Sequence, residues 1–384
     1  MQLELFELYK PHFKIDKPIR LIELFGGIGS QAMALRNLKA PYETWKLVEY
    51  NKYPVMSYNA IHGANFEPMD ITKVHAKDLQ IEDTDKFTYI MTYSFPCQDL
   101  SIAGKRKGMG EGTRSGLLWE VERILRECTE LPQVLLMENV TMVHSNDNVA
   151  DFRKWAEFLE SLGYSNYYQD LNSKDYGVAQ SRDRCFMVSI LGDYYYKFPK
   201  PITLRPRVRD YLKETEEKYF MKSEKANNLV NELVAEDRLF YRGNTKRLKL
   251  LGCMDCSDGT LEKDNRVYDM SGIAATVTCG SSSVQGKYLD IRESAKGKYE
   301  MDGKKYDIRV RKLNPIECWR IMGFSDEDYH KAEKVNSLVQ LQKQAGNSIV
   351  VTCLMAIFSQ MNIQGVDKWN DMTEKDIYKV LTNC

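Results

Sequence analysis

Short apolar runs alternate with helical patterns over the first half of the chain. The runs cover residues 20–25, 44–48, 89–93, 133–137 and 185–190, each the length of a buried strand. Between two of them, Leu118, Val121 and Leu125 recur at the spacing of one helix face. Strands that alternate with helices predict an α/β fold with a mostly parallel, doubly wound sheet.

The alternation stops after residue 201, where the chain becomes polar and irregular, and a helical pattern returns at Arg311. We therefore expect three parts. They are a first domain over residues 1–195, a small irregular β-rich domain over 196–310, and a C-terminal segment over 311–384 that returns to the first domain.

Composition limits the classes of protein to consider. The chain has 384 residues, 43% of them hydrophobic, and a formal net charge of zero. These values are typical of a globular protein, and no apolar stretch approaches the roughly 18 residues that span a bilayer. Nine cysteines, an odd number spread along a long chain, do not indicate a disulfide framework, so a reducing, cytoplasmic location is expected.

Charge is unevenly spread along the chain. Residues 200–312 hold 24 Lys and Arg against 18 Asp and Glu. This basic surplus fits contact with a polyanion, although a solvated face on an ordinary domain explains it equally well.

The first predicted strand ends in a glycine turn, and a helical pattern follows with Ser30 as its expected N-cap. Glycines in such a turn let a ligand approach backbone N–H groups. Glu49, at the end of the second strand, can accept hydrogen bonds from ribose hydroxyls. Asp70, after a third and weaker unit, can accept from an adenine amino group or can simply cap a helix. Together these features predict a cofactor that carries a nucleoside.

Cys97 follows the predicted strand at residues 89–93, and Pro96 ends that strand. Reaction sites of open α/β sheets lie at the carboxyl ends of strands, where a cysteine on a fixed turn is well placed as a nucleophile. Most cysteines are small core residues, and that alternative applies to Cys97 taken alone.

Glu138 directly follows another apolar run. Burial disfavours the charged form of a carboxyl group, which makes Glu138 a candidate acid. Arg182 and Arg184 are two residues apart, so on a strand they share one face and could hold Glu138, a substrate or a phosphate. The alternative for each arginine is an ordinary surface salt bridge.

Residues 101–116, beyond Cys97, contain five glycines and four basic residues. A flexible basic segment in this place is typical of a lid that closes on a polyanion, and a passive surface loop is the alternative.

Taken in order, these motifs resemble those of the DNA (cytosine-5) methyltransferases, which use S-adenosylmethionine, over nearly the whole chain. The matching segments are Phe25–Gly29, Glu49–Tyr50, Asp70, Phe95–Gln98, Glu138–Val140, Gln180–Arg184, Arg311–Gly323 and Gln344–Ser348. Residues 93–101 and 112–120 look especially like the bacterial CpG-specific subgroup. Ser94 departs from the glycine of many members, and because serine is small no loss of activity is expected. The resemblance implies a Rossmann-like methyltransferase domain, with a target-recognition domain at 196–310.

The resemblance also implies roles for individual residues. The catalytic set is Cys97, Glu138, Arg182 and Arg184. The cofactor set is Phe25, Gly26, Gly27, Gly29, Glu49, Tyr50, Asp70, Ile71, Pro96 and Asn347. The set expected to contact DNA is Gln98, Ser101, Lys105, Arg106, Lys107, Arg114, Arg242, Lys246 and Thr276.

The implied reaction transfers a methyl group from S-adenosylmethionine to C5 of cytosine. Addition of the Cys97 thiolate to C6 makes C5 nucleophilic while Glu138 protonates ring N3. The base must first leave the duplex, at a cost of about a few kcal/mol for unstacking. The expected partner is double-stranded DNA rather than a membrane, the chain is expected to be monomeric, and a restriction endonuclease acting on the same site is compatible with the sequence.

Rival functions differ in what they would require. A tRNA methyltransferase on this fold would lack a large recognition domain, and a silent DNA-binding regulator would have lost Cys97 or Glu138. A nicotinamide oxidoreductase would need the dinucleotide glycine pattern. Cys253 and Cys256 lack a second pair of ligands, and the five histidines form no recognisable cluster, so neither a metal site nor a Cys–His hydrolase is expected.

Overall fold

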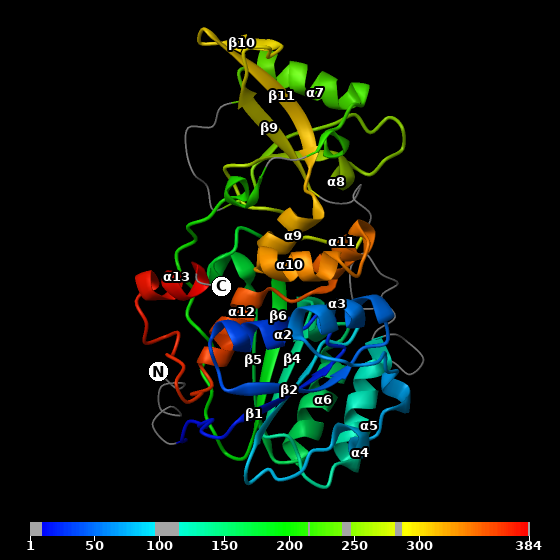
Figure 1. The fold of residues 1–384 in the computed structure, drawn as a ribbon, viewed down its shortest axis with the longest axis vertical. Helices are drawn as coiled ribbons and strands as arrows, with labels where there is room; N and C mark the ends of the chain where they lie inside the picture. The colour runs from blue at the N-terminus through cyan, green and yellow to red at the C-terminus, as the bar shows by residue number, and fades with distance from the viewer. Residues whose placement is uncertain (1–9, 97–114, 214–215, 240–246, 281–285, 383–384) are drawn as a thin grey trace. The chain divides into compact units, whose positions relative to one another are not determined.

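The structure is a computed structural model that describes residues 10–96, 115–213, 216–239, 247–280 and 286–382. It divides into two compact units (Figure 1). The first unit takes in Met1–Asn172, Asp183–Ile202 and Ile349–Cys384, and the second takes in Ser173–Arg182 and Thr203–Ser348. These boundaries differ from the predicted domains, because residues 173–182 and 311–348 belong to the second unit and residues 196–202 belong to the first.

The first unit is built on a six-stranded sheet. Its strands are β1 (Ile19–Leu24), β2 (Tyr42–Val48), β3 (Thr88–Tyr93), β4 (Val134–Asn139), β5 (Tyr164–Asn172) and β6 (Asp183–Leu191). Its helices are α2 (Ser30–Asn37), α3 (Lys52–His62), η1 (Ile71–Lys73), α4 (Ala76–Leu79), η2 (Ser115–Leu117), α5 (Leu118–Glu127), η3 (Thr141–His144), α6 (Val149–Ser161), α12 (Val351–Ser359) and α13 (Glu374–Thr382).

The strand order is β2-β1-β3-β4-β6-β5. The first four strands in that order pair in parallel, and β6 runs antiparallel to both β4 and β5. The predicted α/β fold with a mostly parallel sheet is therefore confirmed. The register places Val48, Leu24, Tyr93 and Met137 side by side across the four parallel strands.

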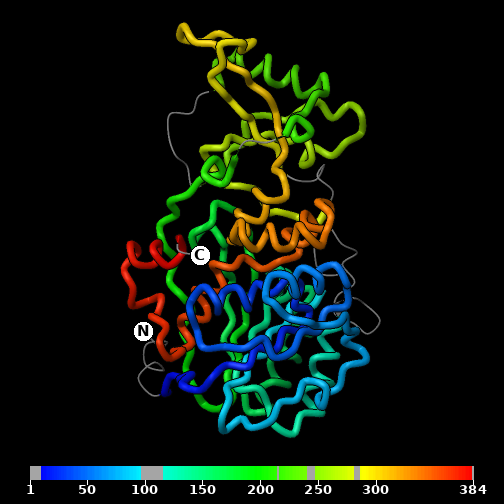
Figure 2. Tube along the Cα trace, in the orientation of Figure 1, coloured from blue at the N-terminus to red at the C-terminus, as the bar shows by residue number. Residues whose placement is uncertain are grey.

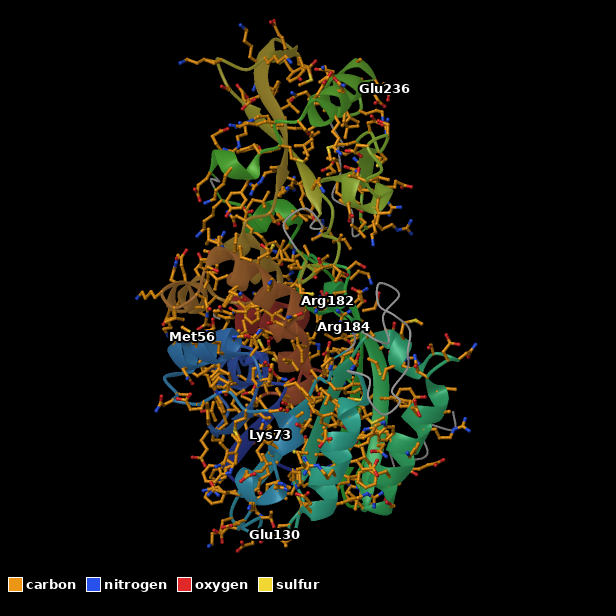
Figure 3. The ribbon with its side chains drawn as sticks, turned by 90° about the vertical axis from the view of Figure 1, so that its right-hand side faces the viewer. Met56, Lys73, Glu130, Arg182, Arg184 and Glu236 are labelled. Atoms are coloured by element: carbon orange, nitrogen blue, oxygen red, sulfur yellow. The ribbon has the colours of Figure 1, made fainter. Side chains whose placement is uncertain are left out.

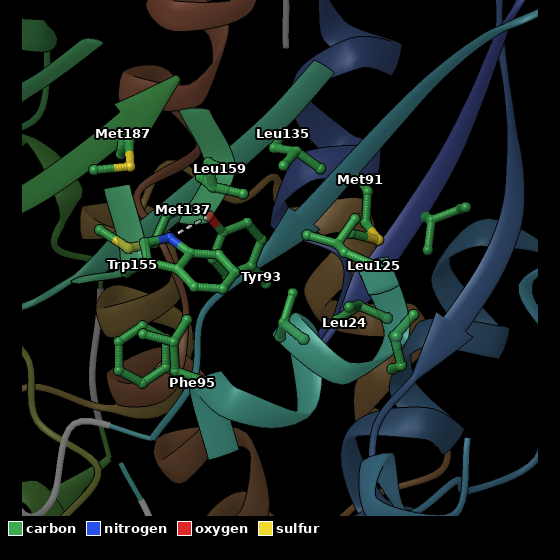
Figure 4. Close-up of a cluster of buried hydrophobic side chains, with 14 of the residues drawn as sticks. Leu24, Met91, Tyr93, Phe95, Leu125, Leu135, Met137, Trp155, Leu159 and Met187 are labelled. Atoms are coloured by element: carbon green, nitrogen blue, oxygen red, sulfur yellow. Dashed lines mark hydrogen bonds between the residues drawn. The ribbon is translucent and has the colours of Figure 1, made fainter. Parts of the chain in front are cut away.

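One face of this sheet carries a large apolar core. Tyr93 and Trp155 of α6 lie at its centre, and the Trp155 indole N–H donates to the Tyr93 hydroxyl at 3.1 Å (Figure 4). Side chains of α5 and α6 fill the rest of this core. Side chains alternate along β1, so its Glu23 points to the opposite face, where it bonds to α2.

The C-terminal segment joins the first unit beside helices formed early in the chain. Figure 2 shows α12, in orange to red, next to the blue α2, and Asn37 of α2 lies 4.0 Å from the Met355 sulfur of α12. All nine residues of α12 are buried, as suits a helix with apolar side chains all round. The apolar sequence from Ser348 to Met361 predicts a helix, and the structure confirms it with the slightly shorter bounds Val351–Ser359.

Three local expectations for this unit were wrong. Gly29, in the left-handed conformation, is the N-cap of α2, and Ser30 is the first helical residue. No strand precedes Asp70 within residues 63–70, all of which the structure describes. The strand β5 was not predicted, because its polar, partly exposed residues are those of a sheet edge and give no apolar run.

The second unit is built on a five-stranded sheet. Its strands are β7 (Leu250–Cys253), β8 (Arg266–Asp269), β9 (Lys287–Glu293), β10 (Tyr299–Met301) and β11 (Lys304–Lys312), in the order β10-β11-β9-β8-β7. Its helices are η4 (Ser173–Tyr176), η5 (Val208–Tyr211), η6 (Glu217–Tyr219), α7 (Glu224–Ala235), α8 (Glu262–Asn265), α9 (Pro315–Ile321), α10 (Asp326–Glu333) and α11 (Leu338–Asn347).

A buried ion pair joins the sheet of the second unit to its helices. Arg311, near the end of β11, donates to the Glu317 carboxylate of α9, and neither residue is exposed to solvent. The same carboxylate accepts from the Asn314 backbone N–H at 2.9 Å, which completes a capping box at the start of α9.

We predict that Glu317→Ala lowers the free energy of unfolding of the second unit by about 3 kcal/mol, because the buried Arg311 guanidinium loses its near carboxylate and is left with that of Asp290 at 3.8 Å. Hydrogen exchange of the β9 and β11 amides under urea measures this free energy. The double variant Arg311→Met, Glu317→Leu should be clearly more stable than Glu317→Ala. An equal loss of unfolding free energy in the two proteins would show that removal of the near partner of Arg311 is not the cause.

Candidate active site at the carboxyl edge of the first sheet

The parallel strands of the first unit bring the candidate residues to one edge of the sheet. Each residue of the row Val48, Leu24, Tyr93 and Met137 is followed at once by a segment that the sequence analysis singled out. These segments begin with Glu49, Phe25, Ser94 and Glu138. Because carboxyl ends of parallel strands share an edge, four separate motifs meet there.

The glycine turn after β1 is shaped by packing and by backbone conformation. A Cβ at Gly26 would overlap Leu47 and Glu23, and one at Gly29 would overlap His62 and Tyr58. Gly27 is also left-handed, with φ of 57°, but a Cβ there would meet no atom within 4 Å. Phe25 takes the left-handed conformation too, with φ of 55°, which costs about 1 kcal/mol or more. The turn is thus packed on one side and open at Gly27.

Glu49 is anchored to this turn. Its carboxylate accepts from the Gly27 N–H at 3.2 Å and from the Asn51 N–H at 2.8 Å. Burial raises the pKa of the Glu49 carboxyl, and these N–H groups oppose the rise. Tyr50, the next residue, is 76% exposed. An acid and a free aromatic ring thus lie beside the open glycine.

Asp70 is the N-cap of η1, the helical alternative considered for it. Its Oδ1 accepts from the Thr72 N–H at 3.1 Å and from the Thr72 hydroxyl at 2.9 Å, and these bonds lower the pKa of Asp70. Ile71 is buried. The contact of Asp70 with an adenine amino group stays a prediction.

Glu23 is a buried acid that the sequence analysis did not single out. It accepts from the Tyr58 hydroxyl at 2.6 Å and from the Ala32 N–H at 3.4 Å, in the first turn of α2. The N-cap residue Gly29 has no side chain that could cap α2. Glu23 therefore supplies an acceptor to the N–H groups in the first turn of α2. Burial raises the pKa of Glu23 to about 7. The available signal was one acid inside the apolar run at 20–25.

Asn139, at the end of β4, ties the two central motifs together. Its side chain donates to the Phe95 carbonyl at 3.0 Å and accepts from the Val140 N–H at 2.8 Å. Asn139 and Phe95 are both buried, and Pro96 is half-buried. The segment that leads to Cys97 is therefore attached to the end of the strand that carries Glu138.

Glu138 and Arg184 form an ion pair in the first unit. The Arg184 Nε lies 3.1 Å from the Glu138 Oε1, and the side chains of Arg184 and Glu138 are only 18% and 10% exposed. Arg184 is labelled in Figure 3. The strand β6 begins at Asp183, so the expectation that Arg182 and Arg184 share a strand face was wrong. Arg184 reaches the acid, and the ion pair fixes the orientation of that carboxylate.

Arg182 belongs to the second unit, where it holds backbone segments together. Its guanidinium donates to the carbonyls of Val277, Gly346 and Ser348 at 2.9, 3.0 and 2.9 Å. Thr276 donates to the Ser181 carbonyl at 2.6 Å in the same unit. Asn347, the last residue of α11, is exposed in the second unit.

Several predicted site residues lie outside the described residues. These are Cys97, Gln98, Ser101, Lys105, Arg106, Lys107, Arg114, Arg242 and Lys246. Their roles stay predictions from the sequence.

One of the five histidines lies in a cluster that its spacing in the sequence did not indicate, while the expectation of no metal site stays a prediction. His144 of η3 lies with Asp170 and Cys185 in a cluster whose three donor atoms are all within 4.8 Å of one another. The residues come from three separate elements, so their spacing in the sequence carried no signal.

Solved structures of methyltransferases share this fold. The Schizosaccharomyces pombe Dnmt2 methyltransferase superposes with a TM-score of 0.60 and 19% identity, covering 89% of this chain and 97% of that one. The Entamoeba histolytica methyltransferase EhMeth gives a TM-score of 0.62 and 16% identity, covering 90% and 98%. At these identities the likeness concerns the fold, which is that of a Rossmann-like methyltransferase with an added β-rich part.

The family described as C-5 cytosine-specific DNA methylase matches residues 19–362, so the chain belongs to that family. Type II methyltransferase M2.ScrFI of Lactococcus lactis subsp. cremoris is 30% identical over 398 residues, covering 89% of this chain and 99% of that protein. Type II methyltransferase M.HhaI of Haemophilus parahaemolyticus is 32% identical over 343 residues, covering 88% and 93%. Orphan methyltransferase M.SssI of Spiroplasma monobiae is 29% identical, covering 90% and 97%.

Within the part of the chain that the structure describes, no helix has both the length and the apolar character that crossing a bilayer needs.

We predict that Glu23 makes stability depend on pH. Its pKa is about 7 in the folded protein and about 4.5 when unfolded, so the folded state binds more protons between these values. Stability is therefore lost as pH rises through this window, by roughly 3 kcal/mol, and Glu23→Gln removes that loss. Urea unfolding of both proteins from pH 4.5 to 8 measures the difference. Parallel pH profiles would contradict the assignment.

We predict that Asn139→Asp lowers kcat for DNA methylation by about 10- to 100-fold, with the KM for DNA nearly unchanged. A carboxylate there cannot donate to the Phe95 carbonyl, so the segment leading to Cys97 loses its anchor. Steady-state kinetics at a temperature where both proteins are folded measures this. Asn166→Asp, at another asparagine that donates to a backbone carbonyl of the same unit, is the control. A rise in KM alone would contradict a positioning role.

Proposed function

We propose that this DNA (cytosine-5) methyltransferase acts on a flipped-out cytosine in a short duplex motif, through a covalent bond between Cys97 and cytosine C6. The observation that carries the proposal is the meeting of four motifs at one sheet edge. There the open glycine turn, the anchored Glu49 and the segment leading to Cys97 follow adjacent strands. The Glu138–Arg184 pair lies at the same edge, within β4 and β6.

The residues at this edge suit S-adenosylmethionine. Gly27 leaves its backbone open on one side, Glu49 offers a carboxylate for ribose hydroxyls, and the Tyr50 ring is free to cover a flat base. Asp70 would accept from the adenine amino group, and the cofactor role that the resemblance gives to Asn347 stays a prediction. When bound, this cofactor supplies a methyl group on a sulfonium, a good leaving group.

The protein residues prepare the base for that transfer. The Cys97 thiolate adds to C6 as Glu138 gives a proton to ring N3, which turns the ring into an enamine with a nucleophilic C5. Arg184 holds the Glu138 carboxyl group and the pyrimidine oxygen. After C5 takes the methyl group, it gives up its proton to solvent and the C6–sulfur bond breaks. Ring N3 returns its proton to Glu138, so the aromatic ring, the Glu138 acid and the Cys97 thiolate are all restored.

The second unit would recognise DNA. The excess of Lys and Arg over Asp and Glu lies mainly in this unit, and residues 97–114 add a basic segment next to the nucleophile. Phosphate contacts would position the duplex, and side chains in the major groove would select its bases. We propose that the recognised motif contains CpG and that the enzyme is monomeric. Such an enzyme is compatible with a partner endonuclease that acts on the same site.

The test is bisulfite sequencing of an unmethylated plasmid after incubation with the purified full chain and S-adenosylmethionine. We predict protected cytosines within one short motif, and their complete loss in Cys97→Ser, whose side chain is nearly the same size but far less nucleophilic. Cys128→Ser, at another half-buried cysteine of the first unit, is the matched control and should keep full activity.

Two outcomes would overturn the proposal. Normal methylation by Cys97→Ser would exclude the covalent step. A folded wild-type protein that binds the cofactor and protects no plasmid cytosine would exclude DNA as its substrate, and the same assay on RNA would then test the tRNA alternative.

A further inference from the structure

His144, Asp170 and Cys185 form a mixed cluster on the first unit that the methyl-transfer site does not use. The His144 Nε2 lies 2.9 Å from the Asp170 Oδ1. One possible ligand atom from each of the three residues, the Cys185 sulfur included, lies within 4.8 Å of the other two. Asp170 on β5 and Cys185 on β6 are directly opposite each other in the sheet. The cluster therefore combines one thiol, one imidazole and one carboxylate from three elements.

The cluster lies on the other face of the sheet from the Glu138–Arg184 pair. Cys185 packs into the apolar core that α5 and α6 cover, and neighbouring residues of a strand point to opposite faces. Arg184 on the same strand thus points away from Cys185. The cluster is therefore a site separate from the Glu138–Arg184 pair.

Local packing holds His144 in place. Its ring lies 5.9 Å from the Phe152 ring and 5.8 Å from the Tyr168 ring, measured between centroids. Asn148 closes the turn around η3 by donating to the Met142 carbonyl at 2.9 Å and the Ser145 hydroxyl at 3.2 Å. The donor atoms are therefore positioned before any ligand arrives, which lowers the cost of binding.

We propose that His144, Asp170 and Cys185 bind a divalent transition-metal ion of the Zn²⁺ class. Sulfur and imidazole ligands favour Zn²⁺ over Mg²⁺ or Ca²⁺, which prefer oxygen alone. Tetrahedral geometry with bonds of about 2.0–2.3 Å needs donor atoms about 3.3–3.8 Å apart, so the cluster needs only small side-chain rotations to fit.

The site is open enough for an ion to enter. The side chains of His144 and Asp170 are 29% and 41% exposed, whereas Cys185 is buried beneath them. Three protein ligands leave the fourth position to water on the exposed side. A bound ion would tie η3, which directly follows the Glu138–Val140 motif, to β5 and β6.

The experiment titrates Co²⁺, as a coloured substitute for Zn²⁺, into the full chain after treatment with a chelator. Cys253 and Cys256 are first changed to serine, because their sulfurs are 3.9 Å apart and could bind the ion themselves. We expect one equivalent to bind, with a thiolate-to-cobalt absorption band and visible bands of tetrahedral intensity, and Zn²⁺ to abolish both.

Variants of the ligands decide the outcome. Cys185→Ser should abolish the thiolate band, and His144→Gln, at a partly exposed position, should weaken binding by about 100-fold or more. Cys128→Ser is the control and should bind normally. The proposal is overturned if the thiolate band persists in Cys185→Ser, if His144→Gln binds as tightly as its parent, or if the parent binds no Co²⁺ at micromolar concentration.

Discussion

The parallel register of four strands is the constraint on which the candidate site depends. Val48, Leu24, Tyr93 and Met137 are neighbours across the sheet, so the segments that follow them leave the sheet at one edge. A shift of one residue in any pair would turn every side chain of that strand to the opposite face. The buried core into which Tyr93 packs opposes such a shift. Packing of the core therefore also keeps the residues of the candidate site aligned.

Three polar residues convert this edge into a defined site. Glu23 accepts a hydrogen bond from the first turn of α2, and Glu49 accepts one from the glycine turn. Asn139 donates to the Phe95 carbonyl and so links the two central motifs. Each accepts from or donates to the backbone of a neighbouring segment, and each is at least partly buried. Buried hydrogen bonds of this kind fix loop geometry, because leaving either partner unsatisfied costs about 1–3 kcal/mol.

The sequence predicts the features that local pattern controls. Glu49 and Glu138 were found because each ends an apolar run, and the glycine turn was found because it interrupts one. Features that depend on distant residues were not found. Glu23 was hidden inside an apolar strand, β5 lacked an apolar run, and His144 meets Asp170 and Cys185 only after folding. Arg182 and Arg184 are two residues apart, yet they belong to different units.

The path of residues 173–182 has a consequence for how such proteins diversify. This short segment leaves the first unit, and within the second unit Gln180 accepts from the Val277 N–H while Arg182 binds the Val277 and Ser348 carbonyls. An exchange of the second unit between relatives that replaced residues 203–348 alone would separate the new residues from the segment 173–182 that they bind. A hybrid that folds has to inherit residues 173–182 together with residues 203–348. An exchange of the second unit therefore requires two crossovers before β6 and two after it.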